Sequence, residues 1–239
     1  MDTLFSQLVL ADVRQDVFRN IVSITASQDL FDDLSAAPGD WALAQQMEDA
    51  VKPPHYLSPT PVIHRPFEDA AWFNAIGWPF KHWQASRFSN GAFGVWYGCA
   101  TPETSVYETA YHWQTGLLRD AGFEIDGVVA ERKIYCVAVQ GMLMDFRPHC
   151  HTEPRLVHKS DYAFTQSIGA RLHRESQPGL LTHSARQSRG ENFAVLNPNL
   201  LTDPRLHCHL TYRFNGSHIV VQKQVGKTWL KVDAEALAV

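Results

Sequence analysis

The chain has 239 residues, long enough for one large domain or one domain with an appendage, and a formal net charge of −4. Its hydrophobic content of 45% excludes a wholly disordered chain. Because the net charge is negative, the chain lacks the excess of Lys and Arg that non-specific binding of nucleic acid requires. No apolar run approaches the ~20 residues of a membrane span, and Met1-Asp2-Thr3 lacks a basic leader, so we expect a cytoplasmic protein without membrane partners.

Residues 1–60 differ in texture from the rest. Val13, Val17 and Ile21 recur at helical spacing, and residues 40–50 are predicted to form another helix. Prolines between residues 53 and 66 then close this region. We expect a helical N-terminal region over 1–60, whose apolar stripe packs on the main domain, binds a partner or forms a homodimer, and a main domain over 61–239.

The next hundred residues mix strands and helices. Strands are predicted at 62–65, 92–99 and 133–139, the second because Val95, Tyr97 and Cys99 alternate with their neighbours. Thr101-Pro102-Glu103 supplies an N-cap, a proline at the first helical position and an early acid. These residues predict a helix over 102–113, and a second helix is predicted over 161–175.

The C-terminal part is predicted to be β-structure. Strands are expected at 192–196, 206–214, 217–225 and 229–232. Asn215-Gly216 favours a hairpin with a type I′ turn, in which both central residues have positive φ. Because few helices alternate with these strands, the pattern favours an α+β fold, with a mixed or antiparallel β core and flanking helices, over a doubly wound parallel sheet.

Residues that could carry chemistry gather between Ser86 and Glu108. The common phosphate-loop, dinucleotide, hydrolase-elbow and zinc-protease motifs are absent from the chain. Tyr97 lies near the end of its predicted strand, Glu108 on the second turn of the following helix, and Arg87 on the loop that feeds the strand. A guanidinium, a phenol ring and a carboxylate that converge suit a ligand with phosphate, a flat ring and a ribose.

Four segments, spread over about residues 62–200, together resemble the RES-domain family, which is named for Arg, Glu and Ser. They are Val62-Ile63-His64-Arg65-Pro66, similar to its opening strand; Ser86-Arg87-Phe88-Ser89-Asn90, similar to its G-R-W-N segment; Val95-Trp96-Tyr97 with Glu108, similar to its strand tyrosine and helix glutamate; and Thr182-His183-Ser184-Ala185-Arg186 with residues 192–198, similar to its late serine segment.

The resemblance implies an ADP-ribosyltransferase-like cleft in which NAD+ is cleaved at its nicotinamide–ribose bond. The ADP-ribose would pass to inorganic phosphate or water, or to a protein side chain, so the reaction is a glycosyl transfer or a hydrolysis. NAD+ is then a substrate, and no cofactor is implied. The family includes toxins of a bacterial toxin–antitoxin class, so a protein antitoxin is an implied partner.

The implied site residues follow from the matching segments. The catalytic set is Glu108, Arg87, Tyr97 and Ser184, and the NAD+-binding set is Arg65, Arg87, Tyr97, Asn90, Ser184 and Arg186. Nicotinamide leaves as a neutral molecule without a general acid, so one carboxylate is enough to stabilise the sugar cation. Glu108 is the candidate carboxylate, with Arg87 for the pyrophosphate or phosphate and Tyr97 for the nicotinamide or its ribose.

Two other functions stay open. The triplets His149-Cys150-His151 and His207-Cys208-His209 could place His149, His151, His207 and His209 around a metal ion if both lay on strands that met, which would favour a metal-dependent hydrolase. A RES-like fold could also have lost turnover and act only by binding a partner.

Overall fold

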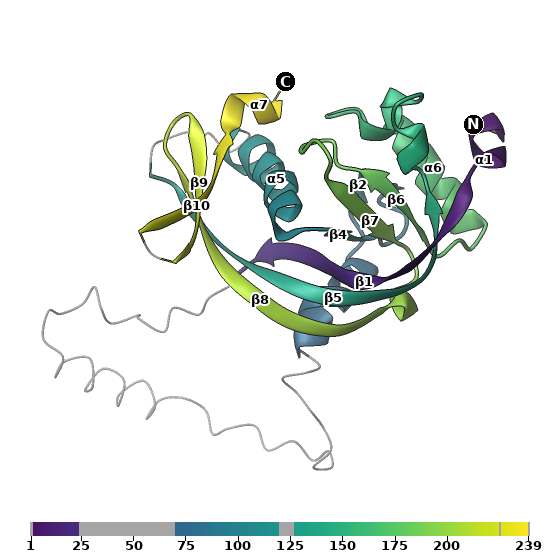
Figure 1. The fold of residues 1–239 in the computed structure, drawn as a ribbon, viewed down its shortest axis with the longest axis horizontal. Coiled ribbons are helices and arrows are strands. Elements are labelled where there is room, and N and C mark those ends of the chain that lie inside the picture. The colour runs from purple at the N-terminus through teal and green to yellow at the C-terminus, as the bar shows by residue number, and fades with distance from the viewer. Residues whose placement is uncertain (1, 24–69, 120–126, 225, 239) are drawn as a thin grey trace, which may run out of the picture. The chain divides into compact units, whose positions relative to one another are not determined.

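The fold is built on one eight-stranded sheet (Figure 1). The computed structural model describes residues 2–23, 70–119, 127–224 and 226–238. The strand order is β1-β4-β7-β6-β5-β8-β9-β10, and every pairing is antiparallel except that of β5 with β6. The strands are β1 (Val9–Val22), β4 (Trp96–Cys99), β5 (Val129–Asp145), β6 (Gly179–His183), β7 (Glu191–Val195), β8 (Leu201–Phe214), β9 (His218–Gln224) and β10 (Lys227–Asp233).

Helices and short turns complete the described residues. The helices are α1 (Asp2–Ser6), α4 (Trp78–Lys81), α5 (Pro102–His112), α6 (Ala163–Arg174) and α7 (Ala234–Ala238). Two π-helical turns, η1 (Phe73–Gly77) and η2 (Trp113–Arg119), and three 3-10 turns, η3 (Arg147–His149), η4 (Pro154–Val157) and η5 (Pro198–Leu200), join them. A small hairpin consists of β2 (Ala85–Ser86) and β3 (Ser89–Asn90).

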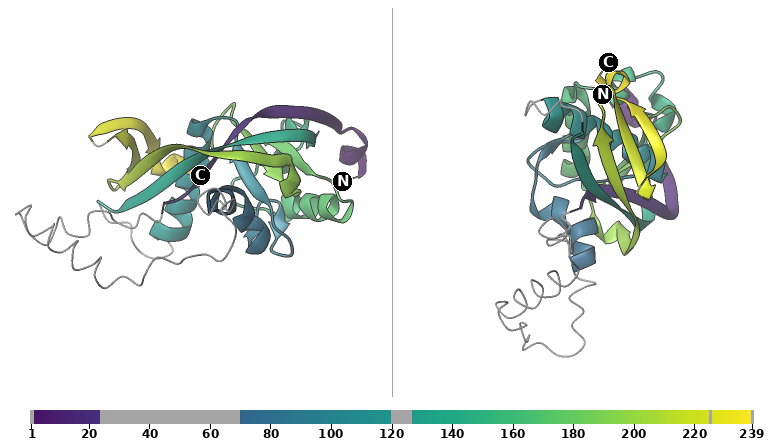
Figure 2. Two further views of the ribbon diagram at one scale, coloured as in Figure 1. Left: turned by 90° about the horizontal axis from the view of Figure 1, so that it is seen from below. Right: turned by 90° about the vertical axis from the view of Figure 1, so that its left-hand side faces the viewer.

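Strand β1 closes a ring within the sheet. It pairs with β5 from Val9 opposite Asp145 to Val22 opposite Arg132, and with β4 where Phe18 lies opposite Cys99. Strands β1, β4, β7, β6 and β5 are therefore hydrogen-bonded in a circle. Figure 1 shows β1, β5 and β8 as long curved strands that run side by side, and Figure 2 shows the β9–β10 hairpin and α6 at opposite ends.

Three apolar clusters hold these layers together. The first packs the ring, with fully buried Trp96 and Val17 among its members. The second packs α5 and α7 on β8, β9 and β10 around buried Tyr212. The third packs α6 on the β2–β3 hairpin around Phe88 and Ile168. Both helices that flank the candidate site are thus fixed by burial of their apolar faces.

The α+β class with a mostly antiparallel sheet and flanking helices is confirmed. Helix α5 begins and ends within one residue of the predicted span, and α6 lies inside its predicted span. The predicted C-terminal strands are confirmed as β7 to β10, and strand 133–139 is the middle of β5. The strand predicted at 92–99 is shorter, because β4 begins only at Trp96.

The helix predicted through Val13, Val17 and Ile21 is wrong, because these residues lie on strand β1. A spacing of four residues fits one helix face and also one strand face, since four is a multiple of two. Gln15 and Arg19 lie on the same strand face, between the three apolar residues. These polar residues interrupt the alternation of apolar and polar side chains that would have indicated a strand. Val13 and Val17 are buried in the core, so this stripe is not a free surface for a partner or a homodimer.

The β8–β9 hairpin is confirmed, but its turn is not type I′. Only Gly216 has a positive φ, of +83°, whereas Asn215 does not. The Asn215 side chain instead accepts a hydrogen bond of 2.8 Å from the backbone N–H of His218, which caps the turn.

Several predictions lie outside the described residues: the helix at 40–50, the strand at 62–65 and the domain boundary near residue 60. Residues 2–23 belong to the same unit as the described residues from 70 onward. None of the helices in the described part of the chain is both long and apolar enough to cross a bilayer.

Candidate active site

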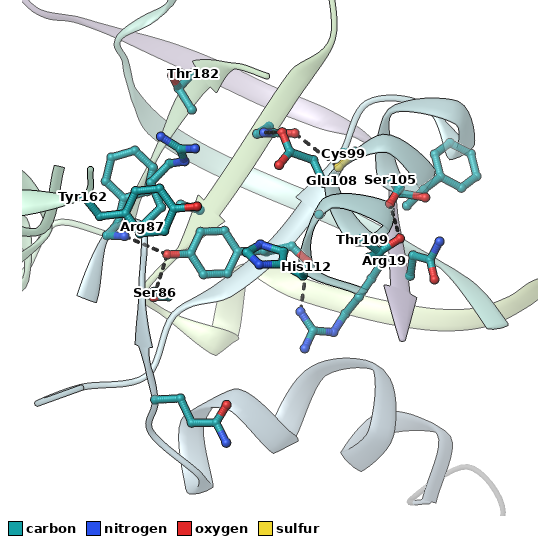
Figure 3. Close-up of a pocket in the computed structure, with 18 of the residues that line it drawn as sticks. Arg19, Ser86, Arg87, Cys99, Ser105, Glu108, Thr109, His112, Tyr162 and Thr182 are labelled. Carbon is teal, nitrogen blue, oxygen red and sulfur yellow. Dashed lines mark hydrogen bonds between the residues drawn. The ribbon is translucent and has the colours of Figure 1, made fainter. Parts of the chain in front are cut away.

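A pocket of about 490 Å³ opens beside α5 (Figure 3). Its walls come from the end of β1, the β2–β3 hairpin, β4, the polar face of α5, two residues of β7, and single residues of β6 and the segment before α6. These parts are distant along the chain, so the pocket exists only in the folded protein.

Helix α5 presents four polar residues to the pocket: Ser105, Glu108, Thr109 and His112. Their spacing of i, i+3, i+4 and i+7 is one face of a helix. The opposite face, with Val106 and Ala110, is fully buried against β8 and β9. The helix starts where predicted because the Thr101 hydroxyl accepts a hydrogen bond of 3.1 Å from the N–H of Thr104.

The carboxylate of Glu108 is held through one oxygen. Ser184 Oγ and Asn192 Nδ2 each donate a hydrogen bond of 2.6 Å to Glu108 Oε1. Cys99 Sγ donates to Asn192 Oδ1 at 3.2 Å, which orients the amide. Burial raises the pKa of Cys99 well above its usual value, so this sulfur keeps its proton as a donor. No described residue donates to Oε2, which leaves that oxygen for a ligand.

Tyr97 contributes its ring to the pocket and uses its hydroxyl to hold the β2–β3 hairpin. Its Oη accepts a hydrogen bond of 2.9 Å from the backbone N–H of Phe88 and shares another of 2.9 Å with Ser86 Oγ. Burial raises the pKa of Tyr97 to about 12, so the phenol is neutral at physiological pH. Tyr97 therefore positions the tip of the hairpin, which carries Arg87.

Arg87 lines the pocket beside Tyr162 (Figure 3). Its guanidinium lies 4.5 Å from the centre of the Tyr162 ring, and its Nη1 donates a 2.7 Å hydrogen bond to the carbonyl of His158. The stacked ring and the carbonyl leave other N–H groups of the fork available, which is the geometry that guanidinium groups use toward phosphate.

The structure does not bring every predicted residue to the pocket. Ser184 does not line the pocket, and its hydroxyl donates a hydrogen bond to Glu108. Arg186 is not a lining residue: its Nη2 donates to the Lys159 carbonyl and to Tyr162 Oη, and its guanidinium stacks on Tyr111. Asn90 points elsewhere, because its Oδ1 accepts from the N–H of Ala92. Arg65 lies outside the described residues.

The reasoning from sequence missed most of the other pocket residues, among them Arg19, His112 and Asn192. Arg19 lies on β1, which was predicted as a helix of a separate region. His112 follows Glu108 by one helical turn, so its i+4 spacing was a readable signal. Desolvation by the pocket walls lowers the pKa of His112, against the opposing effect of Glu108. Asn192 was noted as part of a strand and of the late serine segment, but not as a site residue.

The two His-Cys-His triplets do not meet. His207 and His209 lie on β8, where His209 is opposite Lys133 near the start of β5. His149 follows the other end of β5, in a 3-10 turn rather than a strand. Among the residues that the structure describes, no three His, Cys, Asp or Glu side chains are grouped to hold a metal ion. The geometry therefore gives the metal-dependent alternative no support.

Comparison with known proteins bears on the family. Residues 59–215, about two thirds of the chain, match the family model of the RES domain. The chain belongs to the RES-domain family. The matched segment contains Arg87, Tyr97, Glu108 and Ser184, in the order from which the resemblance was read.

Two other comparisons give less information about this RES-domain protein. A search of curated proteins found no match. The fold is similar to a chain in the crystal structure of the M. tuberculosis MbcT–MbcA toxin–antitoxin complex, with 11% sequence identity and a TM-score of 0.45, over 88% of this chain and 90% of that one. Strand β1 lies before the segment that the RES model matches, yet it completes the ring and one wall of the pocket.

Proposed function

We propose that this RES-domain protein cleaves NAD+ at the nicotinamide–ribose bond and transfers the ADP-ribose to phosphate or water. The observation that carries the proposal is the Glu108 carboxylate, held through Oε1 by Ser184 and Asn192 in a pocket shared with Arg87 and Tyr97. The consumption of NAD+ that the family resemblance implies points to the same substrate.

Glu108 would stabilise the sugar cation as the bond breaks. The bond between C1 of the ribose and the nicotinamide nitrogen breaks with its electron pair going to nicotinamide, so the cationic ring leaves neutral and needs no proton. Positive charge then develops on the ribose, where a fixed carboxylate is most effective because it needs no reorganisation. The acceptor oxygen forms the new bond to C1 and releases its proton.

The other pocket residues would bind and orient the dinucleotide. Arg87 provides a guanidinium for a phosphate group, and the Tyr97 ring offers a flat apolar wall for the nicotinamide or its ribose. Ser184 is a positioning residue for the Glu108 carboxylate rather than a contact for the nicotinamide amide, because its hydroxyl proton is already donated to Oε1.

The proposed activity would make this protein a toxin. Loss of NAD+ stops growth in any cell, so a chain with this activity needs a partner that holds it inactive. We therefore include a protein antitoxin that covers the pocket mouth. The similar M. tuberculosis fold was solved in a toxin–antitoxin complex, which illustrates such a pairing in another protein.

The test is to identify the products. Purified protein is incubated with NAD+ with and without inorganic phosphate, and the products are identified by mass spectrometry. Free nicotinamide with ADP-ribose-1″-phosphate indicates phosphorolysis, and free nicotinamide with ADP-ribose indicates hydrolysis. NAD+ that stays intact under both conditions, while the folded protein still binds it, would reject the enzyme and leave a binding protein.

A further inference from the structure

Arg19 is a charged residue on the inward face of strand β1. Val17 and Val13, two and six positions away on the same face, are buried in the apolar core of the ring. Arg19 occupies the next inward position and lines the pocket instead of the core. In the view of Figure 3 it lies beyond His112, with Arg87 on the other side.

The charge of Arg19 is poorly compensated. Its Nη1 donates a 2.9 Å hydrogen bond to the Tyr97 carbonyl, but its Nε is buried without a hydrogen-bond partner among the described residues. No described carboxylate forms an ion pair with it, and Glu108 is the one acid among the lining residues. Partly burying an unpaired guanidinium is costly, and the Tyr97 carbonyl and the Trp96 ring, whose centre lies 5.6 Å from the guanidinium carbon, offset only part of this cost.

A buried arginine nearby increases the local positive charge. Arg132 on β5 is buried, and its Nε donates a hydrogen bond of 2.7 Å to Asn20 Oδ1. Desolvation, followed by repulsion from Arg132, lowers the pKa of Arg19 to about 10, so Arg19 keeps its charge near neutral pH. Arg132 does not line the pocket, so Arg19 alone presents a guanidinium without a described acidic partner at this end of the pocket, and the nearby charge of Arg132 adds to the attraction for an anion.

We propose that Arg19 forms an anion subsite that binds a phosphate group, separate from the one at Arg87. A phosphate oxygen in the pocket would accept a hydrogen bond from the Arg19 guanidinium and offset its unpaired charge. The phosphate has two sources, the pyrophosphate of the dinucleotide or the free phosphate acceptor. The choice between these sources rests on the proposed function, whereas the anion subsite rests on the burial and charge of Arg19.

The experiment measures binding without turnover. Calorimetry measures the affinity of two ligands, each at constant ionic strength in chloride buffer. One is ADP-ribose, which carries the pyrophosphate but no nicotinamide, and the other is inorganic phosphate. The variants are Arg19→Gln, which removes the charge and keeps an amide for the Tyr97 carbonyl, and Arg19→Lys, which keeps the charge. The matched control is Arg14→Gln, an exposed arginine on the same strand, paired with Asp12 outside the pocket.

We expect Arg19→Gln to weaken the binding of one of the two ligands by about 10- to 100-fold. Arg19→Lys should weaken it by less, and Arg14→Gln should leave it unchanged. Weaker ADP-ribose binding identifies the pyrophosphate as the occupant, and weaker phosphate binding alone identifies the acceptor. Unchanged binding of both ligands by Arg19→Gln would overturn the subsite. If Arg19→Gln does not fold, two other results decide. Wild-type protein that binds neither ligand overturns the subsite. Arg19→Lys that binds either ligand more weakly than the wild type supports it, and Arg19→Lys that binds both equally well overturns the need for a guanidinium there.

Nicotinamide release by the wild-type protein is measured in parallel. Binding of ADP-ribose that depends on Arg19 without any nicotinamide release would reject the proposed function and keep the anion subsite. Nicotinamide release with binding that is indifferent to Arg19 would do the reverse. The two proposals can therefore fail independently.

Discussion

Ser184 donates a 2.6 Å hydrogen bond to Oε1 of Glu108 across 76 positions of sequence. The same serine oxygen accepts hydrogen bonds of 3.0 Å from the backbone N–H groups of Arg186 and Gln187. The hydroxyl is therefore fixed by the turn that follows β6, and it fixes the carboxylate in turn. A group that must face a short-lived cation gains from such rigid support.

Glu108→Gln should abolish most of the NAD+ consumption. The substitution keeps the shape and the oxygen that accepts from Ser184, but it removes the charge that would stabilise the sugar cation. We expect nicotinamide release to fall by about 100- to 1000-fold. Glu103→Gln, on the same helix outside the pocket, is the control and should keep full activity. Undiminished release by Glu108→Gln would eliminate the proposed role of the carboxylate.

Ser184→Ala should lower kcat more than it changes KM. The carboxylate loses one charge-assisted hydrogen bond, so we expect kcat to fall by about 10-fold or more. The free energy of unfolding, measured with urea, should fall by ~1 kcal/mol because two backbone donors lose their acceptor. Exposed Ser188→Ala in the same turn serves for comparison. A change in KM alone would indicate that Ser184 contacts the substrate directly.

Tyr97→Phe should act through Arg87. Without the hydroxyl, the Phe88 N–H loses its acceptor and the hairpin tip that carries Arg87 is released. We expect a rise in KM for NAD+ and a loss of ~1–3 kcal/mol in the free energy of unfolding. Tyr107→Phe on α5, whose ring packs in the second apolar cluster, should leave KM unchanged. An unaltered KM in Tyr97→Phe would separate the hydroxyl from substrate binding.

Tyr97 should also leave a signature in alkaline stability. Burial raises its pKa to about 12 in the folded protein, above the value of ~10 in an unfolded chain. The folded state therefore holds this proton more tightly, and its contribution to stability is complete below pH 10 and is lost as the pH rises toward 12. Wild-type protein should lose more stability than Tyr97→Phe between pH 10 and 12 in urea titrations. Equal losses would contradict the buried, neutral phenol.

Gly169→Ala should be destabilising although alanine favours helices. A Cβ at Gly169 in α6 would overlap the carbonyl oxygen of Phe88, so the helix or the Arg87 hairpin must shift. We expect a lower melting temperature and a raised KM. Gly116→Ala is the matched control, because a Cβ there meets nothing within 4 Å among the described atoms. That control should be neutral or stabilising by up to ~1 kcal/mol. Stabilisation by Gly169→Ala would show that the contact relaxes freely.

The local parts of this protein could be predicted from its amino-acid sequence. The Thr101-Pro102-Glu103 start of α5, the strand around Tyr97 and the C-terminal strands all follow from capping and periodicity, which act over a few residues. It also placed Arg87, Tyr97 and Glu108 in one neighbourhood, because a single strand and helix connect them. These predictions needed no knowledge of distant contacts.

The other features required knowledge of the fold, because they depend on which distant segments pair. The apolar residues of β1 fit a helix and a strand equally well, and only pairing with β5 resolves the choice. That pairing turns Arg19 toward the pocket, and pairing of β4 with β7 sets Asn192 beside Cys99, within reach of Glu108. Asn90 was assigned to the site by its motif, but the direction of its side chain is fixed by a local turn that the motif does not encode.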